Sequence, residues 1–189
     1  MSPPAQRTAH FASARPSGRL VIVGLLAYAA TAAVMFAPWP GLVAAVEQAC
    51  GATALDVRAG WTATEAHDLL AACGPAGRAA YERLQWADAV YPGVTAVALV
   101  LTSRWLWARL GRRGWLIAVP AALAGLLDYA ENVIVWNLLL RWPGSPGALA
   151  DAGGAVTTAK RWVASLAFVI ALTLALAVAG RRRTTTSIE

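Results

Sequence analysis

The sequence predicts an all-α integral membrane protein, a bundle of four transmembrane helices with a helical extracytoplasmic loop. Hydrophobic residues make up 58% of the 189 residues, and only 14% are charged. Four apolar runs reach the length of about 18 residues or more that a helix needs to cross a bilayer. Arginines gather at the ends of these runs, as topology determinants do, and this accounts for the formal charge of +6.

The chain is predicted to form one domain between two short tails. Residues 1–18 are rich in Pro, Ala, Ser and Arg, which is typical of disorder, and 181–189 is a Ser/Thr-rich tail. A cleaved signal peptide is the alternative for the first apolar run, but the run is long for one, so an uncleaved helix is expected. The domain, 19–180, is expected to hold four spans and one outer loop, at about 20–39, 87–107, 115–140 and 156–179 for the spans and 40–86 for the loop.

The outer loop contains two helical patterns. Leu42 to Ala49 is expected to form a short helix lying on the membrane surface. Thr62 and Glu65 fit a capping box, a pattern that opens a helix, here over 63–73. Gly74, followed by a proline, predicts the end of that helix.

A third helical pattern leads from the outer loop into the second span. Arg78, Tyr81, Gln85 and Asp88 follow one another at steps of three or four, so they share one helix face. Pro92 then removes a backbone donor inside the predicted span, which predicts a kink there.

Arginine counts predict the orientation. Three arginines lie in or directly after the N-terminal tail, four lie in the loop between the second and third spans or at its edge, and three lie in the C-terminal tail, against one acid, Glu189. The positive-inside rule then places both termini in the cytoplasm, in a multi-pass protein of the cell membrane.

Two cysteines, Cys50 and Cys73, both fall in the predicted outer loop. An oxidising exterior permits a disulfide between them, worth about 3 kcal/mol. The alternative is two unrelated small buried residues. The chain has no Cys-x-x-Cys pair, so thiol redox catalysis is not expected.

Polar residues interrupt the third predicted span. Asp128, Glu131 and Asn132 lie at i, i+3 and i+4, so a helix places them on one stripe. A charged residue at that depth costs about 2.5–3.5 kcal/mol on insertion scales. Asp88 and Lys160 enter neighbouring spans from the same side, so three helices bring polar groups to a similar depth.

These residues form the predicted site. With three acids and one base in the membrane, Lys160 is expected to pair with an acid, and at least one carboxyl is expected to carry a proton. A neutral carboxyl beside a carboxylate is a general acid/base pair, and it is equally a network that holds helices together. The candidate catalytic residues are Asp128, Glu131 and Asp88, and the candidate substrate-binding residues are Asn132, Lys160, Tyr91, Tyr81, Gln85 and Arg78.

Other classes of chemistry are not indicated. His10 and His67 fall in the tail and the outer loop, and no pattern of metal ligands surrounds them, so no metal or other cofactor is expected. Phosphate-binding loops, the Gly-x-Ser-x-Gly elbow and a basic nucleic-acid-binding face are lacking as well. Gly24, Gly93 and Gly125 are expected to be close-packing positions between helices.

One resemblance covers roughly residues 60–165. Gly77-Arg78 with Tyr81, then Asp88 with Tyr91-Pro92, then Asp128-x-x-Glu131-Asn132, then Lys160, resembles small four-helix bacterial integral membrane proteins of unassigned activity. The resemblance implies a four-helix membrane fold and no mechanism.

Three functions are compatible with these features. The first is a membrane-embedded enzyme that uses buried carboxylates on a hydrophobic, isoprenoid-like substrate, by protonation-initiated isomerisation or by cyclisation as in a terpene cyclase. The second is a non-catalytic membrane partner or lipid-binding module whose polar network is structural, and the third is a proton-coupled carrier. The expected partners are the lipid bilayer and a hydrophobic small molecule, and the sequence does not define an oligomeric state.

Overall fold

A computed structural model describes residues 15–38, 41–144 and 147–186, and within them every element is a helix. Four helical stretches in that part of the chain are long and apolar enough to span a membrane, at Gly18–Phe36, Ala63–Arg109, Leu116–Arg141 and Gly147–Arg181. The prediction of an all-helical chain with four such helices is therefore confirmed. The predicted N-terminal tail falls almost entirely on residues 1–14, outside the described residues.

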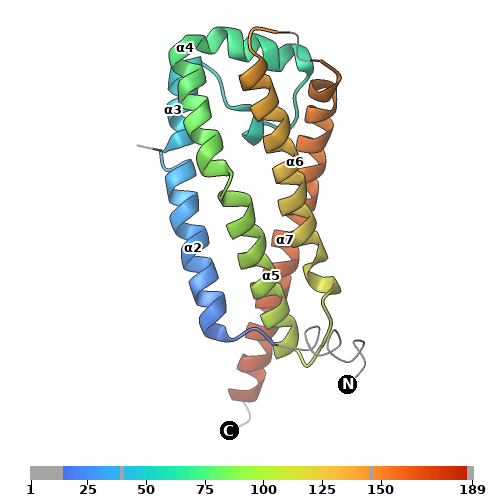
Figure 1. Cartoon of the computed structure of the whole chain (residues 1–189). Helices are drawn as coiled ribbons and strands as arrows, with labels where there is room; N and C mark the ends of the chain where they lie inside the picture. Colours follow the sequence, from blue (N-terminus) through green and yellow to red (C-terminus); the bar gives the residue numbers. More distant parts are fainter. Residues whose placement is uncertain (1–14, 39–40, 145–146, 187–189) are drawn as a thin grey trace, which may run out of the picture.

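The first two helices are stacked end to end. Helix α2 covers Gly18–Phe36, and Ser17 caps it by accepting a hydrogen bond from the amide of Leu20 at 3.3 Å. Helix α3, Leu42–Cys50, continues along the bundle in nearly the same direction (Figure 1). The buried face of α3, the segment predicted to lie on the membrane surface, packs along helix α4.

Helix α4, Ala63–Asp88, changes direction in its middle. The predicted capping box is present, since the amide of Glu65 donates to the Thr62 hydroxyl at 3.2 Å and the Thr62 amide donates to the Glu65 carboxylate at 2.7 Å. Gly74 has a φ of 59°, a left-handed conformation that favours glycine, and this breaks the helix where its end is predicted. The part before Gly74 crosses one end of the bundle, and the part after it runs along the bundle (Figure 1).

Helix α5, Tyr91–Arg109, begins after a short turn that follows α4. Pro92 therefore lies in the first turn of α5, where its missing N–H leaves no intrahelical bond unmade. The predicted kink inside the second span is wrong for this reason: the chain breaks before the proline, and two helices follow each other in place of one bent helix.

The last two long helices pack against each other. A short 3-10 turn, η2 at Leu116–Ala118, leads into α6 at Val119–Arg141. Helix α7, Gly147–Thr186, has 40 residues and extends beyond both limits of the predicted fourth span. Its length of roughly 60 Å, at 1.5 Å per residue, is about twice the thickness of the hydrocarbon core of a bilayer.

The bundle has two distinct ends (Figure 1). We call the end with α3, the first part of α4 and the start of α7 the loop end, and the end with the start of α2 and the close of α5 the terminal end. Most large buried side chains, such as Tyr81 and Leu70, belong to one cluster near the loop end. A second cluster in the other half contains only Leu99, Ala121 and Ala167 among the buried described residues.

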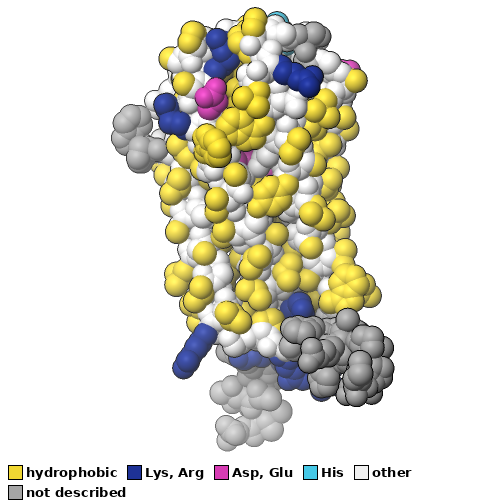
Figure 2. Space-filling model, viewed as in Figure 1, with side chains coloured by type: hydrophobic (Ala, Val, Ile, Leu, Met, Phe, Trp, Pro, Cys, Tyr) yellow, Lys and Arg dark blue, Asp and Glu magenta, His cyan; other side chains and the backbone are white. Residues whose placement is uncertain are grey.

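Small residues bring the helices together in the half towards the terminal end. A Cβ added to Gly125 would lie 2.8 Å from the Ala96 Cβ on α5, and one added to Gly24 would lie 3.5 Å from the Ala98 Cα. A Cβ at Gly93 would lie 2.6 Å from the Tyr129 hydroxyl. The predicted close packing is confirmed at Gly93 and Gly125, whereas a Cβ at Gly24 would make an ordinary van der Waals contact. Hydrophobic side chains cover most of the surface between the two ends (Figure 2).

Candidate functional site

The loop between α3 and α4 folds back into the bundle and is fixed at several points. It contains a short 3-10 turn, η1 at Leu55–Val57. Trp61 packs directly on Gly153 and Gly154 of α7, where any added Cβ would overlap the indole or the Trp61 backbone. The Thr158 hydroxyl, on the next turn of α7, donates to the carbonyl of Ala59 at 3.3 Å. These contacts fix the position of η1 relative to α7.

Asp56, in the middle of η1, is held by two side chains from α4. The Tyr81 hydroxyl donates to Oδ1 at 2.8 Å, and Gln85 Nε2 donates to Oδ2 at 2.8 Å. Tyr81 also accepts a hydrogen bond from the amide of Leu55 at 2.9 Å. Because both Tyr81 and Gln85 are fully buried, a loop carboxyl group is inserted into the interior of the helix bundle.

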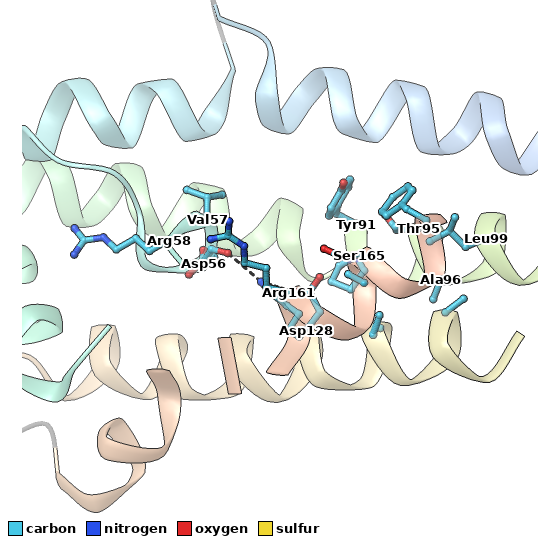
Figure 3. Close-up of a pocket in the computed structure, with 17 residues that line it drawn as sticks. Asp56, Val57, Arg58, Tyr91, Thr95, Ala96, Leu99, Asp128, Arg161 and Ser165 are labelled. Carbon is cyan, nitrogen blue, oxygen red and sulfur yellow. Dashed lines mark hydrogen bonds and ion pairs between the residues drawn. The ribbon is translucent and has the colours of Figure 1, made fainter. Parts of the chain in front are cut away.

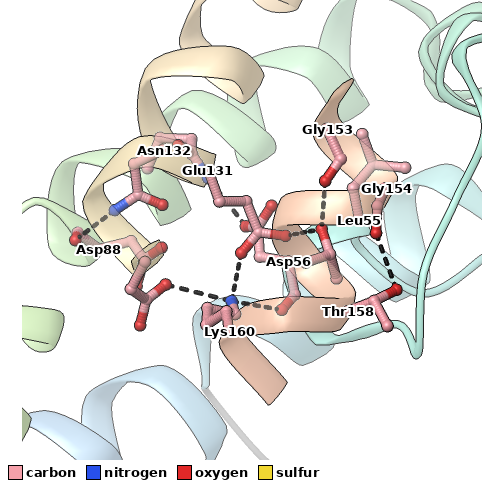
Figure 4. A network of polar contacts seen from close by, with 12 residues as sticks. Leu55, Asp56, Asp88, Glu131, Asn132, Gly153, Gly154, Thr158 and Lys160 are labelled. Carbon is pink, nitrogen blue, oxygen red and sulfur yellow. Dashed lines mark hydrogen bonds and ion pairs between the residues drawn. The ribbon is translucent and has the colours of Figure 1, made fainter. Parts of the chain in front are cut away.

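Lys160 of α7 links the loop to α6. Its Nζ donates to the Asp56 carbonyl at 3.0 Å and to Asp128 Oδ1 at 3.1 Å, and it forms an ion pair with Glu131 Oε2 (Figure 4). These contacts occupy the three donors of the ammonium group. Lys160 therefore acts as a cross-link between three segments, and no proton donor is left for a further partner.

Glu131 lies behind Lys160 and is completely closed off from solvent. Its side chain is 0% exposed, and its other oxygen, Oε1, accepts a hydrogen bond from the hydroxyl of Thr157. Both oxygens of this carboxylate are thus satisfied by α7, as a buried charge requires.

Asp88 and Asn132 form a second contact beside this cluster. Asn132 Nδ2 donates to the backbone carbonyl of Asp88 at 2.8 Å (Figure 4). Asp88 is 3% exposed and its Oδ2 has no hydrogen-bond partner among the described residues. The side chain of Asp88 is therefore buried without an ion pair.

A cavity of about 410 Å³ opens next to the cluster, between α5, α6 and α7 and under η1. This volume lies within the range of small-molecule sites. Charged residues gather at one end, and the other end is apolar (Figure 3). The lining residues are Asp56, Val57 and Arg58 from η1 and its surroundings, Tyr91, Pro92, Thr95, Ala96 and Leu99 from α5, Ala121, Ala124, Gly125 and Asp128 from α6, and Lys160, Arg161, Ala164, Ser165 and Phe168 from α7.

Helix rise gives the level of the charged end. The ring of Phe168 lies 6.4 Å from that of Tyr28, near the middle of α2. Lys160 precedes Phe168 by two turns, which is about 12 Å along α7 towards the loop end. Since α2 is roughly 28 Å long, the charged end lies close to the level at which α2 ends.

The structure separates the predicted catalytic residues. Asp128 lines the cavity, whereas Glu131 and Asp88 are buried away from it. Among the predicted binding residues, Lys160 and Tyr91 line the cavity.

The remaining predicted binding residues do not reach the cavity. Asn132 contacts Asp88, and Tyr81 and Gln85 act through Asp56.

Arg78 is not part of this cluster. Its guanidinium donates to the Leu70 carbonyl at 2.8 Å and lies 5.0 Å from the ring centroid of Trp142. Arg78 thus joins the two parts of α4 to the end of α6. It does so although its sequence spacing places it on the same helix face as Tyr81 and Gln85. The reason is that Arg78 lies only one turn after the break at Gly74, at the edge of the buried face.

The sequence carries little signal for two residues of the site. Asp56 occupies a stretch that reads as a turn, and only its position between Leu55 and Val57, both apolar, sets it apart. Thr157 precedes Lys160 by three residues, so a helix places both side chains on one face. This spacing is the sequence signal that Thr157 contacts the same carboxylate as Lys160, that of Glu131.

Burial raises the pKa of the Asp56 carboxyl to about 6, although Lys160 nearby acts in the opposite direction. Asp56 is therefore able to exchange a proton near neutral pH. Asp128 differs because its charge is compensated directly by the ion pair with Lys160. The charged end of the cavity thus contains two carboxyl groups in different environments, the arrangement that separates an acid from a base.

Cys50 and Cys73 form a disulfide that joins the end of α3 to the first part of α4. Gly77 leaves room for it, since a Cβ there would lie 3.0 Å from the Cys50 sulfur. Within the described residues, no group of three or more His, Cys, Asp or Glu side chains is arranged to hold a metal ion.

Comparisons with protein-family models, with curated proteins and with solved structures give no match for this chain. Its described residues form an all-helical fold with four helices able to span a membrane and a cavity with carboxyl groups at one end.

Proposed function

We propose that this protein is a membrane-embedded enzyme that performs acid–base chemistry on a hydrophobic substrate. The observation that carries the proposal is the cavity between α5, α6 and α7, whose walls are apolar and whose one charged end contains Asp56 and Asp128. Apolar walls exclude water, and carboxyl groups fixed on packed elements are positioned for proton transfer.

The concrete reaction is protonation-initiated isomerisation or cyclisation of an isoprenoid-like double bond. The neutral carboxyl of Asp56 donates a proton to the alkene, which breaks the carbon–carbon π bond and leaves a carbocation. The carboxylate of Asp128 then accepts a proton from a neighbouring carbon, and a new double bond forms. No oxidant or reductant is consumed, and one proton enters as one leaves.

Aromatic rings near the cavity support this chemistry. Tyr91 and Phe168 line it, and Tyr28 lies 6.2 Å from the Tyr91 ring and 6.4 Å from the Phe168 ring. Aromatic faces attract a cation through their quadrupole, so these rings are suited to stabilise a carbocation in the apolar part of the cavity.

We further infer that the chain is a multi-pass protein of the cell membrane with both termini in the cytoplasm. The four apolar helices support the insertion, and the arginines of the loop between α5 and α6 support the orientation. With this placement, the charged end of the cavity lies near the outer boundary of the hydrocarbon layer, at the level where α2 ends.

Lipid profiling tests the proposal. Extracts of cells that contain the wild-type chain, an Asp128→Asn variant or an Asp151→Asn variant are compared by mass spectrometry. Asp151 is an exposed acid at the loop-end start of α7, so Asp151→Asn is a matched control. We expect an isoprenoid or lipid species that depends on the wild type, persists with Asp151→Asn and falls by about a hundredfold with Asp128→Asn, the order of one general acid–base contribution.

A non-catalytic lipid-binding module is the second candidate, and one observation favours it. Lys160 and Glu131 have every polar group occupied by neighbouring residues, as in a network whose purpose is helix packing. If this candidate is correct, Asp128→Asn lowers stability in detergent, and no metabolite differs between any of the three lipid extracts.

A further inference from the structure

The cavity is charged at one end and apolar at the other, as an amphiphilic ligand is. On α7 its lining passes from Lys160 and Arg161 to Ala164 and Ser165 and then to Phe168, a distance of about 12 Å. On α5 the lining runs from Tyr91, which lies beside Ser165, to Leu99 at the apolar end, eight residues or about 12 Å further along (Figure 3). The site therefore offers one charged end and, on α5, about 12 Å of mainly apolar wall, the length of eight helical residues.

Small side chains form much of the apolar walls of the cavity. Ala96, Ala121, Ala124, Gly125 and Ala164 contribute to its walls. Because a Cβ on Gly125 would lie 2.8 Å from the Cβ of Ala96, α5 and α6 are close together on that side. The cavity, about 410 Å³ in volume and closed on that side by two helices, has room for a hydrocarbon chain.

The charged groups of the cavity differ in whether they already have partners. Asp128 pairs with Lys160, and the two carboxyl oxygens of Asp56 accept from Tyr81 and Gln85. Arg161, by contrast, is exposed and makes no hydrogen bond or ion pair within the part of the chain that the structure describes. The charge that lacks a partner in this cavity is therefore positive.

Arg58 lines the same end, and its guanidinium points away from Arg161 (Figure 3). Its Nε donates to the Thr53 carbonyl at 2.9 Å, which ties the side chain to the loop while it still lines the cavity. In Figure 3, Arg58 and Arg161 lie with Asp56 at the end opposite to Leu99. Guanidinium groups bind the planar oxygens of phosphate and carboxylate through paired hydrogen bonds.

We propose that the cavity takes a single-chain amphiphile with an anionic headgroup, a phosphate or a carboxylate, which Arg161 binds while the chain lies between α5, α6 and α7. This inference rests on the proposed function and names the substrate class of that site. The headgroup lies at the charged end of the cavity, and the first carbons of the chain lie beside Asp56 and Asp128, where the proton transfer takes place.

A binding experiment with four ligands of equal chain length tests the proposal. The purified protein, in nanodiscs of zwitterionic lipid, is titrated with decyl phosphate, decanoate, decanol and decyltrimethylammonium, and binding is followed by calorimetry. We expect at least one of the two anions to bind about tenfold or more tightly than the alcohol, as a charge-assisted contact implies, and the ammonium to bind more weakly than either. The phosphate and carboxylate titrations distinguish the two headgroups.

Matched variants assign the effect to the arginine. Arg161→Gln is expected to weaken binding of the preferred anion about tenfold and to leave that of decanol unchanged. Arg83→Gln, on an exposed arginine of α4 outside the cavity, is expected to change neither. Thermal unfolding of each variant verifies that it is folded before its titration is interpreted.

A variant of the apolar wall gives an independent result. Ala164→Leu fills the cavity wall and is expected to weaken binding of all chains that enter, whereas Ala159→Leu, on the exposed side of α7, is not. The proposal is overturned if the ammonium or the alcohol binds as tightly as both anions, or if Arg161→Gln behaves like Arg83→Gln.

The binding experiment and the lipid profiling can fail independently, so they test the ligand class and the proposed enzyme separately. Anion binding that depends on Arg161, without any lipid species that depends on Asp128, leaves the ligand class standing and removes the enzyme. A lipid species that depends on Asp128, without any preference for anions, does the reverse.

Discussion

The two ends of the bundle are stabilised by different means. Towards the loop end, large side chains such as Tyr81, Leu55 and Leu70 are fully buried, a disulfide joins two helices, and Lys160 links three segments. In the half towards the terminal end, the helices meet through alanines and glycines, and side chains such as Leu172 point outward with 61% exposure.

This difference indicates which surroundings each half requires. Only 11% of the most apolar stretch of α2 is buried, and the same holds for α7, so the chain itself leaves these apolar surfaces uncovered, as helices able to span a membrane do. The half near the loop end has an apolar core of its own, as a water-soluble domain does. That core holds the charged cluster in place, and the cavity lies where the two halves meet.

The largest expected effect comes from Lys160→Met in the charged cluster. This change leaves Asp128 and Glu131 buried without their cation, which is expected to cost about 3–5 kcal/mol of unfolding free energy. The measurement is the midpoint of thermal unfolding in detergent micelles. Combining it with Glu131→Gln is expected to restore part of the loss, because one of the uncompensated charges is then absent.

A control for the Lys160 change lies one residue further along α7. Arg161→Gln is expected to change the unfolding free energy by no more than about 0.5 kcal/mol, because the side chain is exposed. If Lys160→Met is as mild as Arg161→Gln, the charged cluster does not contribute to the stability of the bundle.

Removal of the disulfide is expected to have the next largest effect. The bond closes a segment of 23 residues that includes η1, so the double change Cys50→Ser and Cys73→Ser is expected to cost about 3 kcal/mol. A reducing agent is expected to lower the unfolding midpoint of the wild type and to leave that of the double variant unchanged. Equal midpoints for the wild type with and without reductant would contradict this.

The smallest effect is expected for truncation of a side chain on the surface of the half near the terminal end. Leu172→Ala is expected to change stability by no more than about 0.5 kcal/mol, because the leucine is exposed on the surface of the protein. Leu70→Ala, in the buried cluster, is expected to cost about 2–5 kcal/mol. Similar losses for the two leucines, measured in one detergent, would remove the distinction between the halves.

Features with a local cause were predictable from the sequence. The capping box at Thr62 depends on two residues three positions apart, and the four apolar helices depend on composition over about 20 residues. The alignment of Asp128, Glu131 and Asn132 on α6 follows from helix periodicity, and the pairing of Lys160 follows from the cost of a buried charge.

Features that depend on contacts between distant segments were not predictable. Asp56 enters the bundle because Trp61 fits against Gly153 and Gly154 and because Tyr81 supplies a donor, and none of these pairs is close in sequence. The direction of α3 and the position of Pro92 at a helix start also depend on how α4 packs. A proline restricts its own segment equally well in a kink and in a first turn.

The insertion of the Asp56 carboxyl into the bundle is the central claim, and its protonation tests it most directly. Burial with a pKa of about 6 means that the neutral form is favoured relative to the unfolded chain. The stability that Asp56 contributes is therefore complete below about pH 4 and is lost as the pH rises through about 6.

Infrared spectroscopy of the carboxylic acid C=O band follows this proton in the folded protein. We predict a band that disappears with a midpoint near pH 6 in the wild type and is missing from an Asp56→Asn variant. A wild-type spectrum in which the Asp56-dependent band titrates near pH 4, the ordinary range of an exposed aspartate, would contradict the account.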